Sequence, residues 1–529
     1  MDQTNMRWHF SRKEIQAQNC LERSSLGYQA VRGVLWMAFS AGLIYAIRVT
    51  TLMVLARLLS PKDFGTVAAA MVVVGFVATF RDLGISQALV QLHHLESVHI
   101  RTGFVFALFL GLSLTLTIWV VAPFVEQFFR IANLTPVLQT LSLTFFLAGV
   151  SVVSRALLRR EMRFRTLAIL EGLSYAVGYA GIGIPLAALG FGVWALVGAH
   201  LVEVAVSSIG VLILRPHDFR FTIDGRAISQ LLNFGGGYTL ARIANYFSTQ
   251  VDKLFVGRWM GAYSLGIYSR AYYFVGTAIT FAESTIGRVF FSAASQIQQD
   301  RDRLVLGYLY AISFISAIFC PIIAVSVVTA PELVSVLLGR QWSEVANPFR
   351  ILAFGILAGM LYEVSHYLSM AKGAVYPLAA IQAFYLFLIT TGAWIGRQWG
   401  VTGVAGGVLV AMVVNSFLVV TLSLRLIKIA WYTMLRALMP AAISGSVLGL
   451  WAYGMSQILR HFNSPDIVIL IVIGLSCLFI WFLLWRINPE FFFGSLGSEA
   501  MSRFISMVPS WMQALRVILI GRKLSRIQL

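Results

Sequence analysis

Polar side chains recur at helical spacing within one otherwise apolar stretch, residues 233–257. In chain order they are Arg242, Asn245, Thr249, Asp252 and Lys253. Steps of three, four, three and one residue place these positions along one face of a helix. An ionised side chain in the middle of a bilayer costs about 2.5–3.5 kcal/mol, so that face must border protein or a water-filled cavity. We expect the stripe to line a substrate-binding cavity; the alternative is that Asp252 and Lys253 lie close enough to the helix end to be solvated or paired.

A second arginine, Arg48, interrupts the first apolar stretch of the chain. A guanidinium group binds phosphate and pyrophosphate oxygens through two parallel hydrogen bonds. Arg48 and Arg242 therefore predict a clamp for a pyrophosphate group within a shared interior. The alternative is a structural ion pair, for instance of Arg48 with Asp252 or of Arg242 with Glu203.

Acidic and histidine side chains lie in several other apolar stretches. Glu203 follows His200 by three residues and Glu363 precedes His366 by three, so each couple shares a helix face. Histidine titrates near physiological pH, which makes these couples candidates for proton coupling. A hydrogen bond between helices is the ordinary alternative. The full set of candidate coupling residues is Glu171, His200, Glu203, Glu283, Glu363 and His366.

Metal, nucleotide and cofactor chemistry find no support in the sequence. The three cysteines are scattered without paired spacing or a histidine cluster, which predicts neither a disulfide framework nor a metal site. A Gly-Lys dipeptide is absent, which excludes a Walker A loop and ATP as the direct energy source. Small residues at 355–359 and 403–407 indicate close helix packing. We predict no cofactor and no enzymatic activity.

Membrane helices must position these residues. Of the 529 residues, 58% are hydrophobic and 12% are charged, whereas soluble domains carry about 45–50% and 25%. A helix needs about 20 mostly apolar residues to cross a bilayer, and the short alternating runs of a β-barrel are absent. Fourteen stretches qualify: 33–56, 64–80, 102–123, 136–155, 166–188, 190–214, 233–257, 271–290, 304–328, 348–370, 376–396, 401–424, 436–457 and 466–485.

The basic residues indicate an orientation. The chain holds 40 Lys and Arg against 22 Asp and Glu, a net charge of +18. A cytoplasmic N-terminus places most of these basic residues in cytoplasmic segments, as the positive-inside rule requires. Fewer fall outside, among them Arg258 and Arg270 in the connection 258–270. Topology thus accounts for the charge, so no nucleic-acid partner is predicted and both termini are expected in the cytoplasm.

An internal repeat indicates two halves. ARLLSPKDFGTV at 56–67 aligns without gaps with GRWMGAYSLGIY at 257–268, which pairs Gly65 with Gly266. Repeats with an even number of helices share one orientation and are related by an axis along the membrane normal. The predicted divisions are a basic cytoplasmic arm 1–32, an N-lobe 33–214, a cytoplasmic linker 215–232, a C-lobe 233–430, two further helices 431–486 and a basic amphipathic tail 487–529. We predict an all-α polytopic membrane protein of about 14 helices, in which the two six-helix lobes are related by a pseudo-two-fold axis.

Several strings resemble the Wzx-type polysaccharide flippases, in particular their colanic-acid-exporter-like branch. They are ARLLSPKDFG at 56–65, DLGISQALVQ at 82–91, the segment 233–274 and LLGRQW at 337–342. That family belongs to the multidrug/oligosaccharidyl-lipid/polysaccharide exporter superfamily, with the lipid II flippases and the MATE drug exporters. The resemblance implies two lobes facing a central cavity, alternating access and an undecaprenyl-pyrophosphate-linked oligosaccharide as cargo.

The expected function is a flippase for surface polysaccharide biosynthesis in the bacterial cytoplasmic (inner) membrane. Expected partners are the lipid-linked oligosaccharide, anionic membrane lipids, a polysaccharide polymerase and other export machinery. Two alternatives share the architecture: a MATE-like cation antiporter, which should present acids to its cargo, and a lipid II-type flippase for peptidoglycan precursors. A membrane glycosyltransferase would need a sizeable external loop, and the loops of this chain are short.

Overall fold

The computed structural model describes residues 46–81, 84–92, 95–282 and 288–493. Within these ranges some side chains, including those of Arg242 and Asn245, are also left undescribed. The arm 1–32, Glu283 and most of the tail lie outside the described residues. Every element described is helical, which confirms the all-α prediction.

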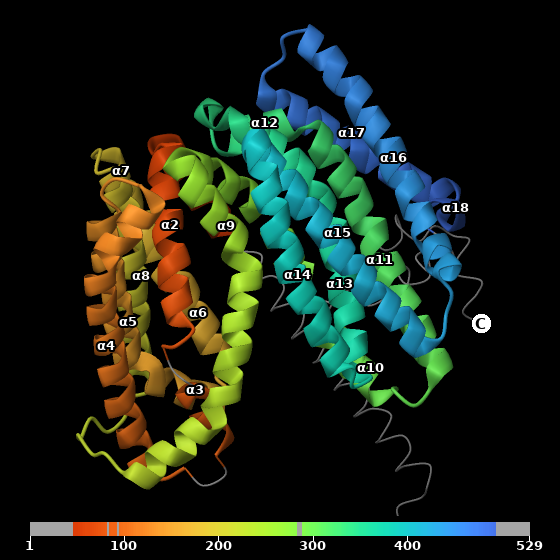
Figure 1. Cartoon of the computed structure of the whole chain (residues 1–529). Helices are drawn as coiled ribbons and strands as arrows, with labels where there is room; N and C mark the ends of the chain where they lie inside the picture. Colours follow the sequence, from red (N-terminus) through yellow and green to blue (C-terminus); the bar gives the residue numbers. More distant parts are fainter. Residues whose placement is uncertain (1–45, 82–83, 93–94, 283–287, 494–529) are drawn as a thin grey trace, which may run out of the picture.

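One group of helices is formed by the first half of the chain (Figure 1). It opens with helical residues 46–58. The elements that follow are α2 Pro61–Ala78, α3 Ile85–Gln91, α4 Ser97–Phe129, α5 Leu134–Arg160, α6 Phe164–Tyr175, the π-helix η1 Ala176–Gly183, α7 Ile184–Ala188 and α8 Val193–Leu214. Helix α9 Gly225–Ala282 comes next and leads from this group into the second one.

The second half forms a separate group beside it (Figure 1). Its elements are α10 Arg288–Gln296, α11 Arg301–Val328, α12 Ala330–Leu337, the 3-10 helix η3 Arg340–Val345, α13 Ala346–Ala371, α14 Val375–Gly396, the 3-10 turn η4 Arg397–Trp399, α15 Gly400–Ile427, α16 Trp431–His461, α17 Asp466–Ile487 and α18 Pro489–Phe493. Helices α16 and α17 pack on the outside of this group, mainly through α16 against α11.

Helix α9 runs through two predicted spans. It breaks at Gly261, whose φ of 79° is open to glycine but strained for other residues. The second span therefore begins close to Ala262, well before the predicted residue 271. The expectation that Arg270 lies in an external connection is wrong, because this residue belongs to the helix.

Ten helical segments of the described chain are long and apolar enough to cross a membrane. One of them, 375–427, contains both α14 and α15. A polytopic membrane protein is thus confirmed, whereas the count of fourteen spans stays a prediction.

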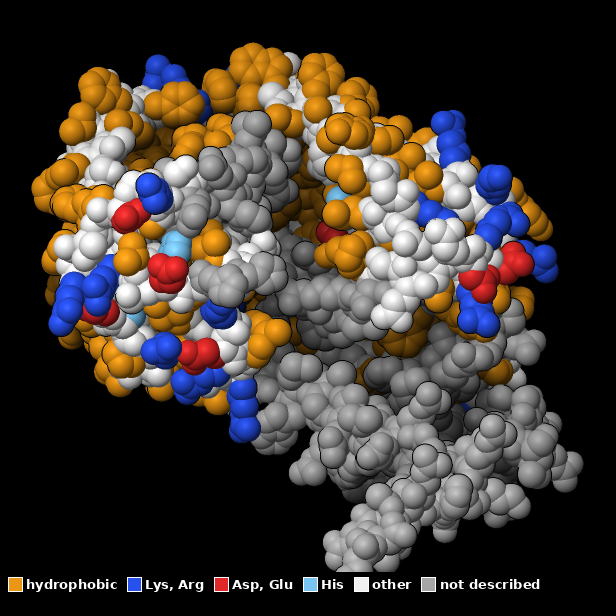
Figure 2. Space-filling view, turned by 90° about the horizontal axis from the view of Figure 1, so that it is seen from below, with side chains coloured by type: hydrophobic (Ala, Val, Ile, Leu, Met, Phe, Trp, Pro, Cys, Tyr) orange, Lys and Arg blue, Asp and Glu red, His pale blue; other side chains and the backbone are white. Residues whose placement is uncertain are grey.

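The connections fall at two opposite ends of the helices (Figure 1). The lower end holds the turn between α5 and α6, the segment 215–224 before α9, and α10. The upper end holds α7 and α12. Figure 2 looks at the lower end and shows Lys and Arg side chains on both groups of helices, with a hollow between the groups. The two ends are those that the predicted topology requires, and the assignment of the lower end to the cytoplasm stays a prediction.

Repeat-related glycines meet where the two groups touch. A Cβ atom on Gly65 would collide with the carbonyl oxygen of Ala262, and one on Gly266 would collide with that of Pro61. Pro61 and Ala262 are themselves paired in the repeat alignment. The contact is therefore the same when the two halves are exchanged, as expected at a two-fold axis.

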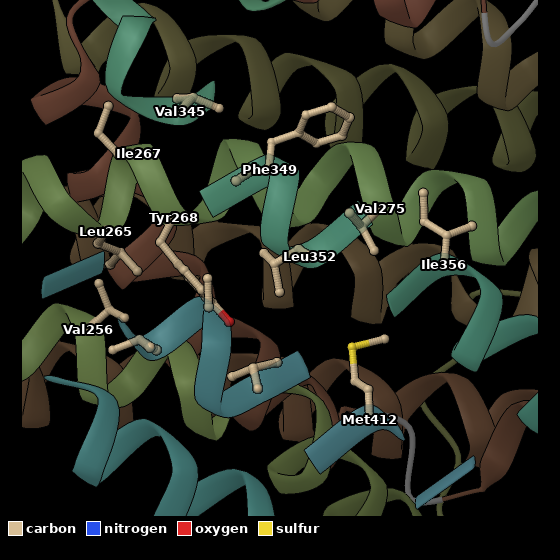
Figure 3. Packing of buried hydrophobic residues seen from close by; sticks show 14 of the residues in the cluster. Val256, Leu265, Ile267, Tyr268, Val275, Val345, Phe349, Leu352, Ile356 and Met412 are labelled. Atoms are coloured by element: carbon tan, nitrogen blue, oxygen red, sulfur yellow. The ribbon is translucent and has the colours of Figure 1, made fainter. Parts of the chain in front are cut away.

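The second part of α9 also enters the core of the other group (Figure 3). Its buried Leu265 and Tyr268 lie in one cluster with Phe349 of α13 and Met412 of α15. On its other side α9 packs against α2. This helix therefore connects both groups.

Close helix packing is confirmed for the glycines at 403–407. Cβ atoms on Gly403 and Gly407 of α15 would collide with the backbone of α14 at Gly396 and Gly392. The missing side chains allow these two helices to approach at backbone distance.

Candidate functional site

A cavity of about 760 Å³ lies between the first group of helices and α9. Its walls come from residues 46–58, α2, the α6–η1 segment, α8 and both parts of α9. The polar and aromatic residues that line it are Arg48, Phe64, Tyr175, Tyr179, His200, Glu203, Tyr246, Gln250, Lys253, Ser269, Arg270, Tyr272, Tyr273, Thr277 and Thr280.

Two arginines of the cavity rest on aromatic rings. The Arg48 guanidinium carbon lies 5.2 Å from the ring centroid of Tyr175. That of Arg270 lies 4.6 Å from the ring centroid of Phe64 and 5.4 Å from that of Tyr273. The rings hold each cation in place without neutralising its charge. The guanidinium N–H groups therefore stay available to an anion.

Both arginines carry an unsatisfied donor. The Nε atoms of Arg48 and Arg270 are buried and have no hydrogen-bond partner in the part of the chain that the structure describes. Buried polar groups are nearly always paired, so an unpaired one needs an explanation. A bound anion would supply the missing acceptor at both positions.

A third cation, Lys253, completes the positive charge of the cavity. Its Nζ donates to Gln250 Oε1 at 2.8 Å and lies 5.1 Å from the ring centroid of Tyr272. Gln250 and Lys253 lie in the first part of α9, whereas Arg270 and Tyr272 lie in its second part. The break at Gly261 folds the two parts back so that both reach the cavity.

The π-helix η1 shapes the opposite wall. Tyr175 and Tyr179 stack with ring centroids 4.6 Å apart and planes at 19°. A Cβ on Gly178 would lie 2.5 Å from the carbonyl oxygen of Ala199 and 2.8 Å from the backbone nitrogen of Glu203. The glycine thus lets η1 touch α8 beside Glu203. Single π-helical turns inside α-helices are frequent at functional sites.

Glu203 is the one carboxylate among the described residues that line the cavity. Its Oε2 lies 3.1 Å from Nδ1 of His200, and the two side chains are 24% and 23% exposed. The cavity therefore holds three basic side chains against one acidic group, which favours an anionic ligand.

Comparison with known proteins gives the family. The family described as "Polysaccharide biosynthesis protein" matches residues 54–347, more than half of the chain. The chain belongs to this family of polysaccharide biosynthesis proteins.

Two curated relatives cover most of this family member. This chain is 24% identical to the lipopolysaccharide biosynthesis protein WzxC of Escherichia coli over 436 residues. The aligned region covers 81% of this chain and 85% of WzxC. This chain is 28% identical to the succinoglycan biosynthesis transport protein ExoT of Rhizobium meliloti over 365 residues. The aligned region covers 68% of this chain and 73% of ExoT.

Two solved structures share the fold of this polysaccharide biosynthesis protein. The lipid II flippase MurJ in an inward closed conformation matches with a TM-score of 0.71 at 13% identity, over 85% of this chain and 99% of MurJ. An inward-facing MATE family transporter matches with a TM-score of 0.60 at 17% identity, over 72% of this chain and 94% of the transporter. At these identities the likeness concerns the fold alone.

In this polysaccharide biosynthesis protein, the residues of the polar stripe predicted on α9 do not all line the cavity. Lys253 lines the cavity, whereas Thr249 is exposed and donates to the carbonyl oxygen of Tyr246 at 3.0 Å. Asp252 is only 1% exposed and accepts from the Tyr268 hydroxyl at 2.5 Å. Both parts of α9 are packed on several sides, so residues of one predicted face meet different surroundings. Arg242 and Asn245 lie outside the described side chains.

The predicted ion pair of Arg48 with Asp252 does not form among the described residues. Arg48 lies over Tyr175, and Asp252 pairs with Tyr268 instead. The alternative pair of Arg242 with Glu203 involves an undescribed side chain.

The candidate coupling residues are spread over the molecule. His200 and Glu203 meet in the cavity as their spacing predicts. Glu171 is exposed, 3.7 Å from Arg155 Nη1, and does not line the cavity. His366 Nδ1 lies 3.5 Å from the Tyr362 hydroxyl, and Glu363 is half-buried in α13 away from this cavity. Glu283 lies outside the described residues.

Sequence reasoning missed the role of Arg270. The signal available was its setting, SRAYYF at 269–274, in which a single arginine stands beside aromatic residues and the string begins three residues after Gly266. A helix that begins near residue 262 places Ser269, Arg270, Tyr272 and Tyr273 within one turn and a half.

Among residues 46–81, 84–92, 95–282 and 288–493, no group of three or more His, Cys, Asp or Glu side chains could hold a metal ion.

Proposed function

We propose that this protein is a flippase that moves a pyrophosphate-linked oligosaccharide on an undecaprenyl carrier across the cytoplasmic membrane. The observation that carries this proposal is the pair of buried, unpartnered guanidinium Nε atoms of Arg48 and Arg270 in one cavity. The names of WzxC and ExoT, a lipopolysaccharide biosynthesis protein and a succinoglycan transport protein, support a polysaccharide precursor as cargo.

The charge of the cavity suits a pyrophosphate diester. Arg48, Lys253 and Arg270 are cationic, and Glu203 is the one acid among the described lining residues, so the lining is positive whether or not Glu203 is ionised. A pyrophosphate joined to a lipid on one side and to a sugar on the other carries two negative charges. Guanidinium groups bind such oxygens bidentately, which an ammonium group cannot do.

Tyrosines around these cations suit a sugar. Tyr175, Tyr179, Tyr272 and Tyr273 present ring faces and hydroxyl groups to the same cavity. A ring face packs against the apolar face of a sugar, and the hydroxyl can donate or accept a hydrogen bond. The first sugars of the oligosaccharide would therefore lie beside the pyrophosphate.

Alternating access is supported by contacts that close the upper end of the molecule. Arg57 Nη2 donates to the carbonyl oxygen of Val336 at 2.8 Å, and Trp342 Nε1 donates to that of Ala56 at 2.8 Å. Together with the contact of Gly65 and Gly266, these bonds join the two groups of helices above the cavity. Release at the upper end requires that these contacts open and that the lower end closes.

The proposal extends to the predicted topology and partners. We assign the lower end and both termini to the cytoplasm, the N-lobe to 33–214, the linker to 215–232, the C-lobe to 233–430 and the two further helices to 431–486. A polymerase of the external face would consume the translocated cargo.

Two related functions make different demands on the cavity. A MATE-like antiporter for cations should present acids, and the described lining carries more basic than acidic groups. A lipid II-type flippase also needs to bind pyrophosphate, so the MurJ-like fold alone does not choose between the two cargoes.

Gene disruption tests the cargo directly. We expect a pyrophosphate-linked oligosaccharide of a surface polysaccharide to accumulate on the cytoplasmic side, as measured by mass spectrometry of extracted lipids. Accumulation of lipid II instead would assign the chain to peptidoglycan synthesis. Accumulation of neither precursor would contradict the proposed function.

A further inference from the structure

The His200–Glu203 pair places an acidic group inside the proposed site for an anion. Both side chains line the cavity that Arg48, Lys253 and Arg270 make positive. Tyr175 and Tyr179 line the same cavity and stack with ring centroids 4.6 Å apart. A cargo that fills this cavity therefore brings its negative charges into the space that Glu203 also lines.

Titratable and charged groups from three other elements line the cavity together with the pair. They are Arg48 from residues 46–58, Tyr175 and Tyr179 from the α6–η1 segment, and Tyr246, Lys253, Arg270, Tyr272 and Tyr273 from α9. An ionised Glu203 would share the cavity with three cations, which offset its negative charge as long as no other anion is bound. When cargo brings its own negative charges, the cations are shared and repulsion disfavours the ionised pair.

We propose that binding of the pyrophosphate-linked cargo is coupled to uptake of about one proton by the His200–Glu203 pair. The inference rests on the proposed function. The pair is close enough, at 3.1 Å, to share that proton as one unit. Binding linkage is reciprocal, so a protonated pair also binds the cargo more tightly.

The sign of this coupling has a consequence for transport. In a proton antiporter the proton and the cargo compete for the protein, whereas here each favours binding of the other. The proton therefore travels outward with the cargo and leaves at the external side. One fewer net negative charge crosses the membrane for each cargo, which reduces the drive that a negative interior supplies.

Calorimetric titration of the full chain in nanodiscs tests the coupling. The ligand is farnesyl-diphosphate-linked N-acetylglucosamine, a diester whose phosphates do not titrate between about pH 5 and 8, so any proton taken up binds to the protein. Titrations in buffers of different ionisation enthalpy count the protons. We expect uptake of about one proton for the native protein, and a tighter affinity at lower pH.

Variants locate the proton. The double variant His200→Gln/Glu203→Gln fixes the pair in its uncharged state, and we expect it to bind without proton uptake. At about pH 7.5 its affinity should be on the order of tenfold tighter, the effect of removing one like charge from the cavity. Glu344→Gln, which changes an exposed carboxylate in η3, should retain both the native affinity and the proton uptake.

Three outcomes decide against the inference. Binding of the ligand to the native protein without proton uptake, or with proton release, overturns it and leaves the proposed function standing. Weaker binding by the double variant than by the native protein at about pH 7.5 overturns it as well. Failure of the native protein to bind this ligand overturns the proposed function together with the inference.

Discussion

At the scale of residues, the cavity uses charges that sequence spacing could identify only in part. Arg48, Lys253 and the His200–Glu203 pair are recognisable because they interrupt apolar stretches. Arg270 is not recognisable in this way, because its helix begins at a break at Gly261 that the hydropathy does not show. Asp252 shares the predicted stripe but is buried against Tyr268. Periodicity identifies a face of a helix, whereas the packing of neighbouring helices decides what that face meets.

Replacement of Arg270 tests the anion site. We expect Arg270→Ala to abolish export at normal membrane levels, because the cavity loses a guanidinium fork, and Arg270→Lys to restore export only in part. Export is measured as surface polysaccharide and the membrane level by immunoblot. Arg340→Ala, at an exposed arginine of η3, is the matched control and should export normally. Full export by Arg270→Ala would remove this residue from the site.

The buried carboxylate of Asp252 predicts a loss of stability in Tyr268→Phe. The phenol is fully buried and donates to Asp252 at 2.5 Å, so its removal leaves the carboxylate without that donor. We expect the free energy of unfolding to fall by about 1–3 kcal/mol, measured by thermal unfolding in detergent. Tyr308→Phe removes a bond between two hydroxyl groups, Tyr308 and Ser365, and should cost less. An equal loss in both variants would contradict a special role for the carboxylate.

At the scale of elements, the segment 215–224 is fixed to the lower end of the first group of helices. Asp218 accepts from Arg101 Nε at 2.8 Å, and His217 Nδ1 lies 2.9 Å from Ser154 Oγ. Burial, followed by the nearby charge of Arg215, lowers the pKa of His217 below its ordinary value of 6.5. The sequence marked this segment as a basic linker, but its docking depends on side chains from α4 and α5 that are distant in the chain.

Acidification should release this segment. Because the pKa of His217 is lower when docked than when free, the docked state binds fewer protons, and its stability is lost as the pH falls below about 6.5 and through the lowered value. Hydrogen exchange of 215–224 should therefore speed up on acidification after correction for the intrinsic rate. His217→Gln should remove this pH dependence, whereas His461→Gln, at an exposed histidine, should retain it. A pH-independent exchange in the native protein would refute the prediction.

The glycine contact between α2 and α9 predicts a matched pair of variants. Gly266→Ala places a methyl group against the carbonyl oxygen of Pro61, which forces the two helices apart. We expect a lower melting temperature and increased labelling of a Leu52→Cys reporter in the cavity by a membrane-impermeant thiol reagent added outside. Gly454→Ala, a helical glycine of α16 with open space around it, should change neither quantity. Unchanged labelling in Gly266→Ala would show that this contact does not close the cavity.

At the scale of the whole molecule, hydropathy and the repeat predicted an all-helical membrane protein, and the structure confirms this class. Apolar length is a local property that a sequence displays directly. The number of spans is harder to predict, since α9 joins two predicted spans through one glycine and 375–427 joins two more. The cavity depended on the contact of distant segments and could not be located from one stretch of sequence.

Topology gives the molecule-wide prediction. Cysteines introduced at exposed positions in 161–165 and 218–223 should react only after permeabilisation, because both segments lie at the lower end, which we assign to the cytoplasm. Cysteines at 340–344, at the upper end, should react from outside in intact cells. External labelling of 218–223 would reverse the proposed orientation and, with it, the direction of transport.

The exchange-symmetric contact of Gly65 and Gly266 also bears on how such a chain can arise. Either half carries both surfaces of the contact, a glycine and the carbonyl oxygen that faces the other glycine, so two copies of one half-length ancestor could have joined through it as a homodimer. Duplication and fusion would then free each half to diverge. The cavity shows that divergence, because the repeat places Thr249 opposite Arg48 and Ala69 opposite Arg270. The contact of Gly65 and Gly266 is symmetric between the halves, whereas at each aligned position the cavity draws its charge from one half alone.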